Sequence, residues 1–295
     1  MLYRTHVMKR FHLATTVGLV LATSCAQAAT TIDAGNHFAY GANLGWMDWR
    51  GDTANGAVIG EYVCSGYVYS ANVGWISLGG GSPANGIQYQ NNSGTDFGVN
   101  TDGLGNLRGY AYGANIGWIN FENTGAPKVD IKTGLFSGYA YSANCGWISL
   151  SNAVALVQTD SIQQGVDSNH DGIPDAWELQ NFGTISINVN ADPDGDGMSN
   201  LQEYLAGTDP NNAASNLKIT AQSFSAGGTF ASLTWNSVLT RCYYVEKATT
   251  LGSANWTDSG LGQIASAGSA TSTSLSDTNA SARFYRIRAV RPLLQ

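Results

Sequence analysis

A nine-residue segment rich in aromatic residues recurs four times in the first half of the chain, and it restricts the fold more than any other feature. The copies end at Trp46, Trp75, Trp118 and Trp147. The step from the first copy to the second equals the step from the third to the fourth, whereas the middle step is longer. Repetition at a fixed period is the signature of repeat architectures, in which each unit packs against its neighbours. The sequence therefore predicts four equivalent units, with an insertion before the third in the Gly-, Asn- and Ser-rich stretch 80–107.

Each copy predicts two short strands joined by a tight turn. Residues 139–142 alternate large and small side chains, which is the period of a strand. Residues 143–146, Ala-Asn-Cys-Gly, have the composition of a turn, because Asn and Gly tolerate positive φ angles. The following residues, 147–150, are rich in strand formers. Four such hairpins over residues 29–157 can stack as a solenoid or close as an array, and both topologies stay open.

The repeat aromatics allow two interpretations. We expect the tryptophans and paired tyrosines to form the core of the repeat domain, because they are the largest apolar groups available. A row of solvent-facing tryptophans would instead indicate a stacking surface for carbohydrate.

Two acidic segments, residues 167–178 and 192–203, both match the calcium-loop pattern D-x-[DN]-x-[DN]-G-x5-E. Calcium takes six to eight oxygen ligands, including a backbone carbonyl at position 7 and a bidentate Glu at position 12. The predicted ligands are Asp167, Asn169, Asp171, Ile173, Asp175 and Glu178 in loop one, and Asp192, Asp194, Asp196, Met198, Asn200 and Glu203 in loop two. Because each loop carries four carboxylates that repel one another, we expect two bound calcium ions rather than a solvated acidic linker.

Helix signals follow each loop. Pro174 suits the first turn of a helix, and Gly183 suits its end. Ser199 and Gln202 have the spacing of a capping box, and Gly207 can end the second helix. No matching amphipathic helix precedes either loop, so the sequence predicts a loop–helix pair instead of two complete helix–loop–helix hands.

The two loops and the Glu-Tyr-Leu-Ala-Gly-Thr-Asp-Pro segment at the end of loop two resemble the calcium-binding repeats of secreted bacterial proteins, which are similar to thrombospondin type 3 repeats and dockerin loops. The resemblance covers residues 158–212. It lacks the thrombospondin cysteines, and its repeat spacing differs from that of dockerins, which argues against a cohesin partner. The resemblance implies EF-hand-like loops in which calcium is structural and keeps a linker rigid. An extracellular module of this kind binds calcium with an affinity on the order of 10⁻⁴–10⁻³ M.

Both flanking regions also show resemblances. The units in residues 29–157 resemble repeats of bacterial surface proteins. Residues 213–295 contain several short strand patterns and resemble a fibronectin type III module, with Trp235 on an early strand and Phe284 and Tyr285 on a late one. We therefore expect a mostly β protein: an aromatic β-repeat domain, a short helical pair of calcium loops, and a small C-terminal β-sandwich.

Residues 1–28 have the pattern of a secretory signal peptide. The basic residues of this segment are Arg4, Lys9 and Arg10. Residues 11–24 are mostly apolar but too short to span a bilayer, and Ala28 ends a small-x-small cleavage site. The alternative is a lipoprotein acylated at Cys25. Either interpretation predicts a secreted or cell-surface protein, and no later segment is apolar and long enough to be a membrane span.

Charge and cysteine content exclude several classes of function. Without the three basic residues of the signal, 14 minus 3 leaves 11 basic residues against 21 acidic ones, a net charge of −10. Such a chain does not suit nucleic acid or an anionic membrane as a partner. The remaining cysteines, Cys64, Cys145 and Cys242, have neither a disulfide-framework nor a zinc-site spacing, although a Cys64–Cys145 disulfide is an open option.

Support for catalysis in the sequence is weak. His37 and His170 are the histidines that follow the signal, and no nucleophile elbow, HExxH helix or phosphate loop is present. For a carboxylate pair, the first candidates in the repeats are Asp48, Glu61, Glu122 and Asp130. We predict a non-enzymatic, exported calcium-binding protein with a structural or adhesion role, contacting surface polysaccharide or protein. A carbohydrate-binding accessory protein is the alternative, and a glycoside hydrolase ranks third.

Overall fold

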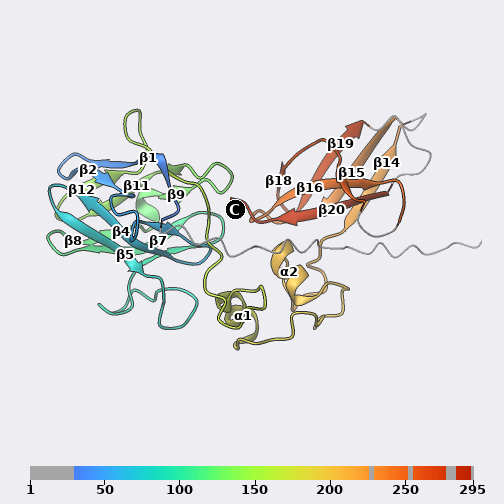
Figure 1. Ribbon diagram of the computed structural model, residues 1–295, viewed down its shortest axis with the longest axis horizontal. Coiled ribbons are helices and arrows are strands. Elements are labelled where there is room, and N and C mark those ends of the chain that lie inside the picture. The colour runs from blue at the N-terminus through green and yellow to red at the C-terminus, as the bar shows by residue number, and fades with distance from the viewer. Residues whose placement is uncertain (1–29, 226–228, 252–254, 277–283, 294–295) are drawn as a thin grey trace, which may run out of the picture.

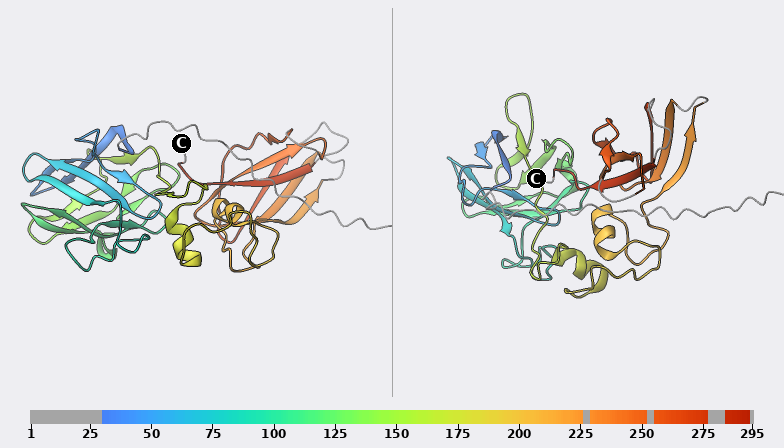
Figure 2. Two further views of the ribbon diagram at one scale, coloured as in Figure 1. Left: turned by 60° about the horizontal axis from the view of Figure 1, so that its bottom comes forward. Right: turned by 45° about the vertical axis from the view of Figure 1, so that its right-hand side comes forward.

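The computed structural model describes residues 30–225, 229–251, 255–276 and 284–293 and confirms the mostly β fold. The predicted signal peptide lies outside the described residues. Two β bodies stand side by side, and the two helices lie together beneath them (Figures 1 and 2). The helices are α1 (Asp175–Phe182) and α2 (Asn200–Ala206). Neither these nor any other helix in the described part of the chain has the length and apolarity needed to cross a membrane.

The four repeats form four hairpins that close into one sheet. The hairpins are β1–β2 (Ile32–Gly41, Gly45–Asp48), β4–β5 (Cys64–Ser70, Gly74–Gly80), β7–β8 (Leu107–Gly113, Gly117–Asn120) and β11–β12 (Tyr139–Ser142, Gly146–Ser149). Neighbouring hairpins pair antiparallel, and β12 pairs back onto β1 through Tyr40 opposite Ser149. The topology is therefore a closed array, which resolves the choice that the sequence left open.

Short elements surround this closed sheet. They are β3 (Val58–Ile59), β6 (Val99–Thr101), the 3-10 helix η1 (Asn123–Gly125), β9 (Lys128–Val129), β10 (Phe136–Ser137) and β13 (Val157–Thr159). The antiparallel pairing of β13 with β1 brings the end of the repeat region back to its start.

The tryptophans and most of the repeat tyrosines lie outside the closed sheet, so the prediction that they form its core is wrong. The outward cross-strand pairs are Tyr40–Trp46, Tyr69–Trp75, Tyr112–Trp118 and Tyr141–Trp147. Their ring centroids lie 4.8–5.4 Å apart, and the four tryptophans are 46–49% exposed. The next pair along each hairpin points inward and is buried: Ala39–Met47, Val68–Ile76, Ala111–Ile119 and Ala140–Ile148.

The size of the closed sheet explains this orientation. Eight strands enclose an interior just wide enough for side chains to fill. Three inward alanines opposite isoleucine or methionine, together with Val68 opposite Ile76, fit that width, whereas four Tyr–Trp pairs would not. Because side chains alternate between faces, placing the aliphatic residues inside sends every Tyr and Trp of the pattern outside. Trp49, Phe121 and Phe136 fill the core beyond the strand ends, with Trp49 5.1 Å from Phe136.

The four turns at one end of the closed sheet are joined in a ring of hydrogen bonds. The side-chain amides of Asn43, Asn72, Asn115 and Asn144 donate to the carbonyls of Cys145, Leu44, Val73 and Ile116, at 3.1, 2.9, 3.0 and 2.9 Å. Each asparagine thus holds the turn of the neighbouring repeat, and the fourth turn is connected back to the first. The repeated Asn-x-Gly sequence therefore does more than form a turn, because the asparagine links one hairpin to the next.

Side chains of alternating size close this end of the core. Repeats one and three combine a glycine before the turn with a large turn residue, and repeats two and four combine serine with a smaller one. The combinations are Gly41 with Leu44, Ser70 with Val73, Gly113 with Ile116, and Ser142 with Cys145. A Cβ added at Gly113 would lie 2.9 Å from Cγ1 of Ile116. The two positions are therefore matched in volume within each repeat.

The three described cysteines are free thiols, so the optional Cys64–Cys145 disulfide is wrong. Cys64 begins β4, whereas Cys145 lies in a turn at the other end of the closed sheet. The length of a strand separates the two sulfur atoms. Burial raises the pKa of the Cys64 thiol to about 12, which makes it unreactive.

The C-terminal body is a small two-sheet β-sandwich, as predicted. One sheet holds β14 (Ile219–Phe224), β15 (Phe230–Asn236) and β19 (Ala270–Ser276), and the other holds β16 (Cys242–Ala248), β17 (Thr257–Asp258), β18 (Ile264–Ala265) and β20 (Phe284–Val290). Trp235 and Tyr243 face each other in its core at 5.8 Å. Its first strand begins at Ile219.

We predict that Gly113→Ala destabilises the chain by about 1–3 kcal/mol, because the new methyl group overpacks the core against Ile116. Gly80→Ala is the matched control, since a Cβ there meets no atom within 4 Å. The pair Gly113→Ser with Ile116→Val reproduces the combination of the second repeat and should recover most of the loss. Urea unfolding measures all three variants, and a double variant less stable than Gly113→Ala would refute the size matching.

Candidate calcium sites

Both loops run directly into helices whose ends are those predicted. Pro174 is the N-cap residue of α1, and Gly183 ends that helix with a φ of 70°. Ser199 and Gln202 form the complete capping box of α2, which Gly207 ends with a φ of 74°. These local signals fix where each helix begins, and so they place Glu178 and Glu203 within the first turn of α1 and α2.

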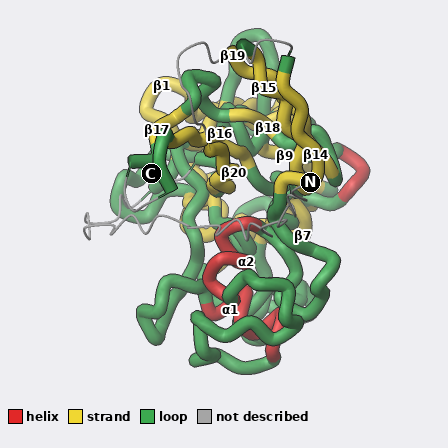
Figure 3. Tube along the Cα trace, turned by 90° about the vertical axis from the view of Figure 1, so that its right-hand side faces the viewer, coloured by secondary structure: helices red, strands yellow, loops and turns green. Residues whose placement is uncertain are grey.

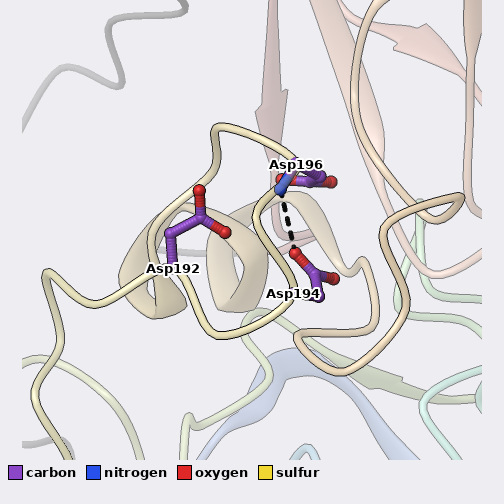
Figure 4. A group of neighbouring side chains, drawn as sticks. All are labelled: Asp192, Asp194 and Asp196. Carbon is purple, nitrogen blue, oxygen red and sulfur yellow. Dashed lines mark hydrogen bonds between the residues drawn. The ribbon is translucent and has the colours of Figure 1, made fainter.

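Loop two gathers three carboxylates at one point. Ligand oxygens of Asp192, Asp194 and Asp196 lie within 4.8 Å of one another, and Figure 4 shows the three side chains along the loop. Both oxygens of Asp192 and one oxygen each of Asp194 and Asp196 accept backbone N–H groups of the loop, as in the 2.9 Å bond from the Gly197 amide to Asp192. The second oxygens of Asp194 and Asp196 are buried without a hydrogen-bond partner in the described chain. Four of the six aspartate oxygens thus hold the loop, and the remaining two are available to a cation.

Glu203 adds the strongest evidence for a cation. Its side chain is 0% exposed, and neither carboxylate oxygen has a hydrogen-bond partner among the described residues. Burial, and then the charges of Asp194 and Asp196, raise the pKa of Glu203 to about 8. A buried carboxylate without a partner is costly, whereas a calcium ion bound bidentately by position 12 satisfies both oxygens. The donor set therefore fits calcium.

Loop one has the same kind of hydrogen bonds from backbone N–H groups to aspartates as loop two, but more of its carboxylate oxygens have partners. The Gly172 amide donates to Asp167 at 3.0 Å, and the Ile173 amide donates to Asp171 at 3.0 Å. The amide of Asn169 also donates to Asp171, so the oxygen that stays unpartnered in Asp196 is satisfied here. Asp175 accepts the N–H and hydroxyl of the neighbouring serine at position 168. Before it binds a cation, loop one therefore carries less electrostatic strain than loop two.

Glu178 closes loop one. It is 0% exposed; one oxygen accepts the Ile187 amide at 3.0 Å, and the other is buried without a partner in the described residues. Burial raises its pKa, and the charge of Asp171 adds to the effect. This side chain can offer one free oxygen where Glu203 offers two.

The residues at positions 7 and 9 have roles in packing as well. Ile173 and Met198, whose carbonyls are the predicted ligands at position 7, are both buried. Ile173 packs with Trp177 and Tyr204 beneath the β bodies, whereas Met198 belongs to the core of the C-terminal sandwich. Asn200, at position 9, is 2% exposed and donates to the carbonyl of residue 188. Each loop is therefore anchored to a hydrophobic cluster by the side chain of its position-7 residue, whose carbonyl is a predicted calcium ligand.

Comparison with known proteins matches residues 192–213 to the family described as the bacterial TSP3 repeat. Comparisons with curated proteins and with solved structures give no match. The matched segment contains loop two, α2 and the residues after it, which indicates a calcium-binding repeat at loop two. For loop one, the assignment rests on the residues and geometry described above.

The four acidic residues considered for catalysis each have a structural partner. The carboxylate of Asp48 lies 2.7 Å from Nδ1 of His37. Glu122 accepts the N–H of residue 109, and Asp130 accepts two backbone N–H groups of its own turn. Glu61 pairs with two arginines of the C-terminal body. No local pattern in the sequence indicates these last pairs, because their members lie far apart along the chain.

We predict a pH dependence in the calcium-free protein that originates in Glu203. From about pH 4.5, the ordinary value for Glu, to about 8, the folded state keeps a proton that the unfolded state has released. Stability therefore falls as the pH rises through this window. The fall should shrink in Glu203→Gln and disappear from the unmodified chain when calcium replaces the proton. Denaturant unfolding with and without calcium measures this, and an unchanged slope in Glu203→Gln would show that another group is responsible.

Proposed function

We propose that this chain is an exported, non-enzymatic structural protein in which two calcium ions fix the segment between two β domains. The observation that carries the proposal is Glu203, which is fully buried beside Asp194 and Asp196 with both oxygens unpartnered in the described chain. The match to the bacterial TSP3 repeat supports the same conclusion. The signal pattern at residues 1–28 supports export to a compartment where calcium is abundant.

Packing around the two loops supports a bracing role. Tyr62, from the closed-sheet body, packs against the cluster of Ile173, Trp177 and Tyr204. A Cβ at Gly86, in the insertion before the third repeat, would lie 2.6 Å from Leu179 of α1. On the other side, Ala206 of α2 belongs to the sandwich core. The calcium segment therefore contacts both β bodies. Figure 3 shows the two helices beneath the strands.

We predict that calorimetry gives a stoichiometry near two calcium ions per chain and that Glu178→Gln with Glu203→Gln abolishes calcium-dependent thermal stabilisation. Each substitution removes the negative charge at position 12 of one loop. Glu122→Gln, a partly buried carboxylate of the closed sheet, is the matched control and should retain both ions. Equal melting temperatures of the unmodified chain with calcium and with chelator would contradict the proposal.

A second candidate function is carbohydrate binding, which the exposure of the four tryptophans favours. Each outer tyrosine also faces a polar residue of the neighbouring hairpin. These cross-strand pairs are Tyr69–Asp48, Tyr112–Ser77, Tyr141–Asn120 and Tyr40–Ser149. An aromatic face beside a hydrogen-bonding group suits a sugar ring, which is apolar on its faces and polar at its edge. We propose an uncharged polysaccharide as the ligand, because three of the four polar neighbours are uncharged.

We predict that the unmodified chain binds at least one of cellulose, chitin and amylose, and that Trp118→Ala with Trp147→Ala weakens binding about tenfold or more, which is about 1.4 kcal/mol. Phe230→Ala is the control, because Phe230 is 55% exposed but lies in the C-terminal body. Sedimentation with the insoluble polysaccharide measures retention. Absence of binding to all three, or equal loss in the control, would eliminate this function.

A further inference from the structure

The three parts of the chain meet at one carboxylate, that of Glu61, which follows β3 in the closed-sheet body. Its oxygens lie 3.5 Å from Nη2 of Arg241 and 3.3 Å from Nη1 of Arg291. Arg241 directly precedes β16, and Arg291 directly follows β20, so both belong to one end of one sheet of the sandwich. Figure 1 shows this end of the sandwich next to the closed sheet. The carboxylate therefore joins the two β bodies electrostatically.

Helix α2 contributes the third member of this group. The Tyr204 hydroxyl donates to Glu61 at 3.1 Å and accepts from Arg291 at 2.5 Å. Arg241 donates to the carbonyls of Tyr204 and Leu205 at 2.7 and 3.0 Å, which caps the C-terminal end of the helix. Tyr204 immediately follows Glu203, the last predicted ligand of loop two. The position of the hydroxyl therefore depends on how loop two holds its helix.

Loop one reaches the same group through a different residue. Nη2 of Arg291 donates to the side-chain oxygen of Gln164 at 2.9 Å. The side-chain amide of Gln164 in turn donates to the carbonyl of Gly172 at 3.0 Å. Gly172 is the glycine at position 6 of loop one. Arg291 is thus connected to loop one through Gln164 and to loop two through Tyr204.

Burial makes these contacts sensitive to small displacements. The side chains of Arg241, Arg291 and Glu61 are only 6%, 10% and 14% exposed. Charge pairs at this depth are screened little by salt, and removing one member leaves the others buried and unpaired. Movement of α2 or of loop one would therefore break the group as a whole instead of loosening it gradually.

We propose that calcium in the two loops controls whether the C-terminal sandwich is rigidly attached to the closed sheet, with Glu61, Tyr204, Arg241 and Arg291 as the connecting group. This inference rests on the proposed calcium binding and adds its mechanism and consequence. With calcium, α2 and Gly172 are fixed, and the group assembles. Without calcium, repulsion among the loop carboxylates displaces both, and the two β bodies move independently.

Thermodynamic linkage requires that the connecting group also affects the calcium affinity of the two loops. If calcium favours the assembled group, then breaking the group must weaken calcium binding by the same factor, although no ligand has changed. Couplings between distinct sites are typically about fivefold or more in affinity. Glu61→Gln keeps the size of the side chain and removes its charge. It should therefore retain a stoichiometry of two ions while its calcium affinity falls about fivefold or more.

The experiment measures the distance between the two β bodies in the full chain by double electron–electron resonance. Spin labels are attached through Val154→Cys and Leu261→Cys, which are 78% and 38% exposed and lie in the closed-sheet body and the sandwich. Cys145→Val removes the partly exposed native thiol and reproduces the residue of the second repeat; Cys64 and Cys242 are buried. We expect one narrow distance distribution with calcium, and its loss in chelator.

Glu61→Gln should lose the narrow distribution even with calcium, whereas Glu122→Gln should keep it. A distribution that stays narrow in chelator, while calorimetry shows that calcium binds, would overturn the proposal and leave the calcium function standing. A narrow distribution or an unchanged calcium affinity in Glu61→Gln would also overturn it. If the unmodified chain binds no calcium, the proposed function itself fails, and calorimetry alone reveals this.

Discussion

Asp192, Asp194 and Asp196 hold ligand oxygens within 4.8 Å of one another beside the buried Glu203, and this concentration of negative charge is the constraint on which the arrangement of the chain depends. Carboxylates this close repel one another unless a cation lies between them. The backbone of loop two already uses four of the six oxygens of these aspartates to hold its shape. These bonds hold the loop backbone in place, and a calcium ion would offset the repulsion that remains among the carboxylates.

The two loops are also parts of hydrophobic clusters, and this explains how a local ion site can affect distant strands. Ile173 connects loop one to the cluster beneath the β bodies, and Met198 connects loop two to the sandwich core. In each loop, the residue whose carbonyl is the predicted ligand also packs its side chain into a hydrophobic cluster. Displacement of the carbonyl would therefore also displace packed apolar atoms, which resist gradual movement because protein interiors are densely packed.

Local sequence signals predicted local structure well. The caps at Ser199, Gly183 and Gly207 and the four hairpins each depend on a few adjacent residues, and the structure confirms them. The orientation of the aromatics was predicted wrongly, because alternation shows which residues share a face but not which face is inside. Only the closure of eight strands, with its limited interior, decides that. The contacts of Glu61 could not be predicted, because its partners are brought near only by the packing of three separate parts.

The ring of asparagine bonds at the turns has a consequence for how such a protein can change over time. In an open repeat array, units can be added or lost at the ends, because each unit contacts only its two neighbours. Here every turn bonds to another turn, and the fourth bonds to the first, so there is no end at which to add a unit. A fifth hairpin would widen the interior beyond what alanine and isoleucine can fill. Gene duplication of a single unit would therefore produce a chain without a packed core, so the number of repeats is fixed at four while their exposed aromatic surfaces are free to diversify.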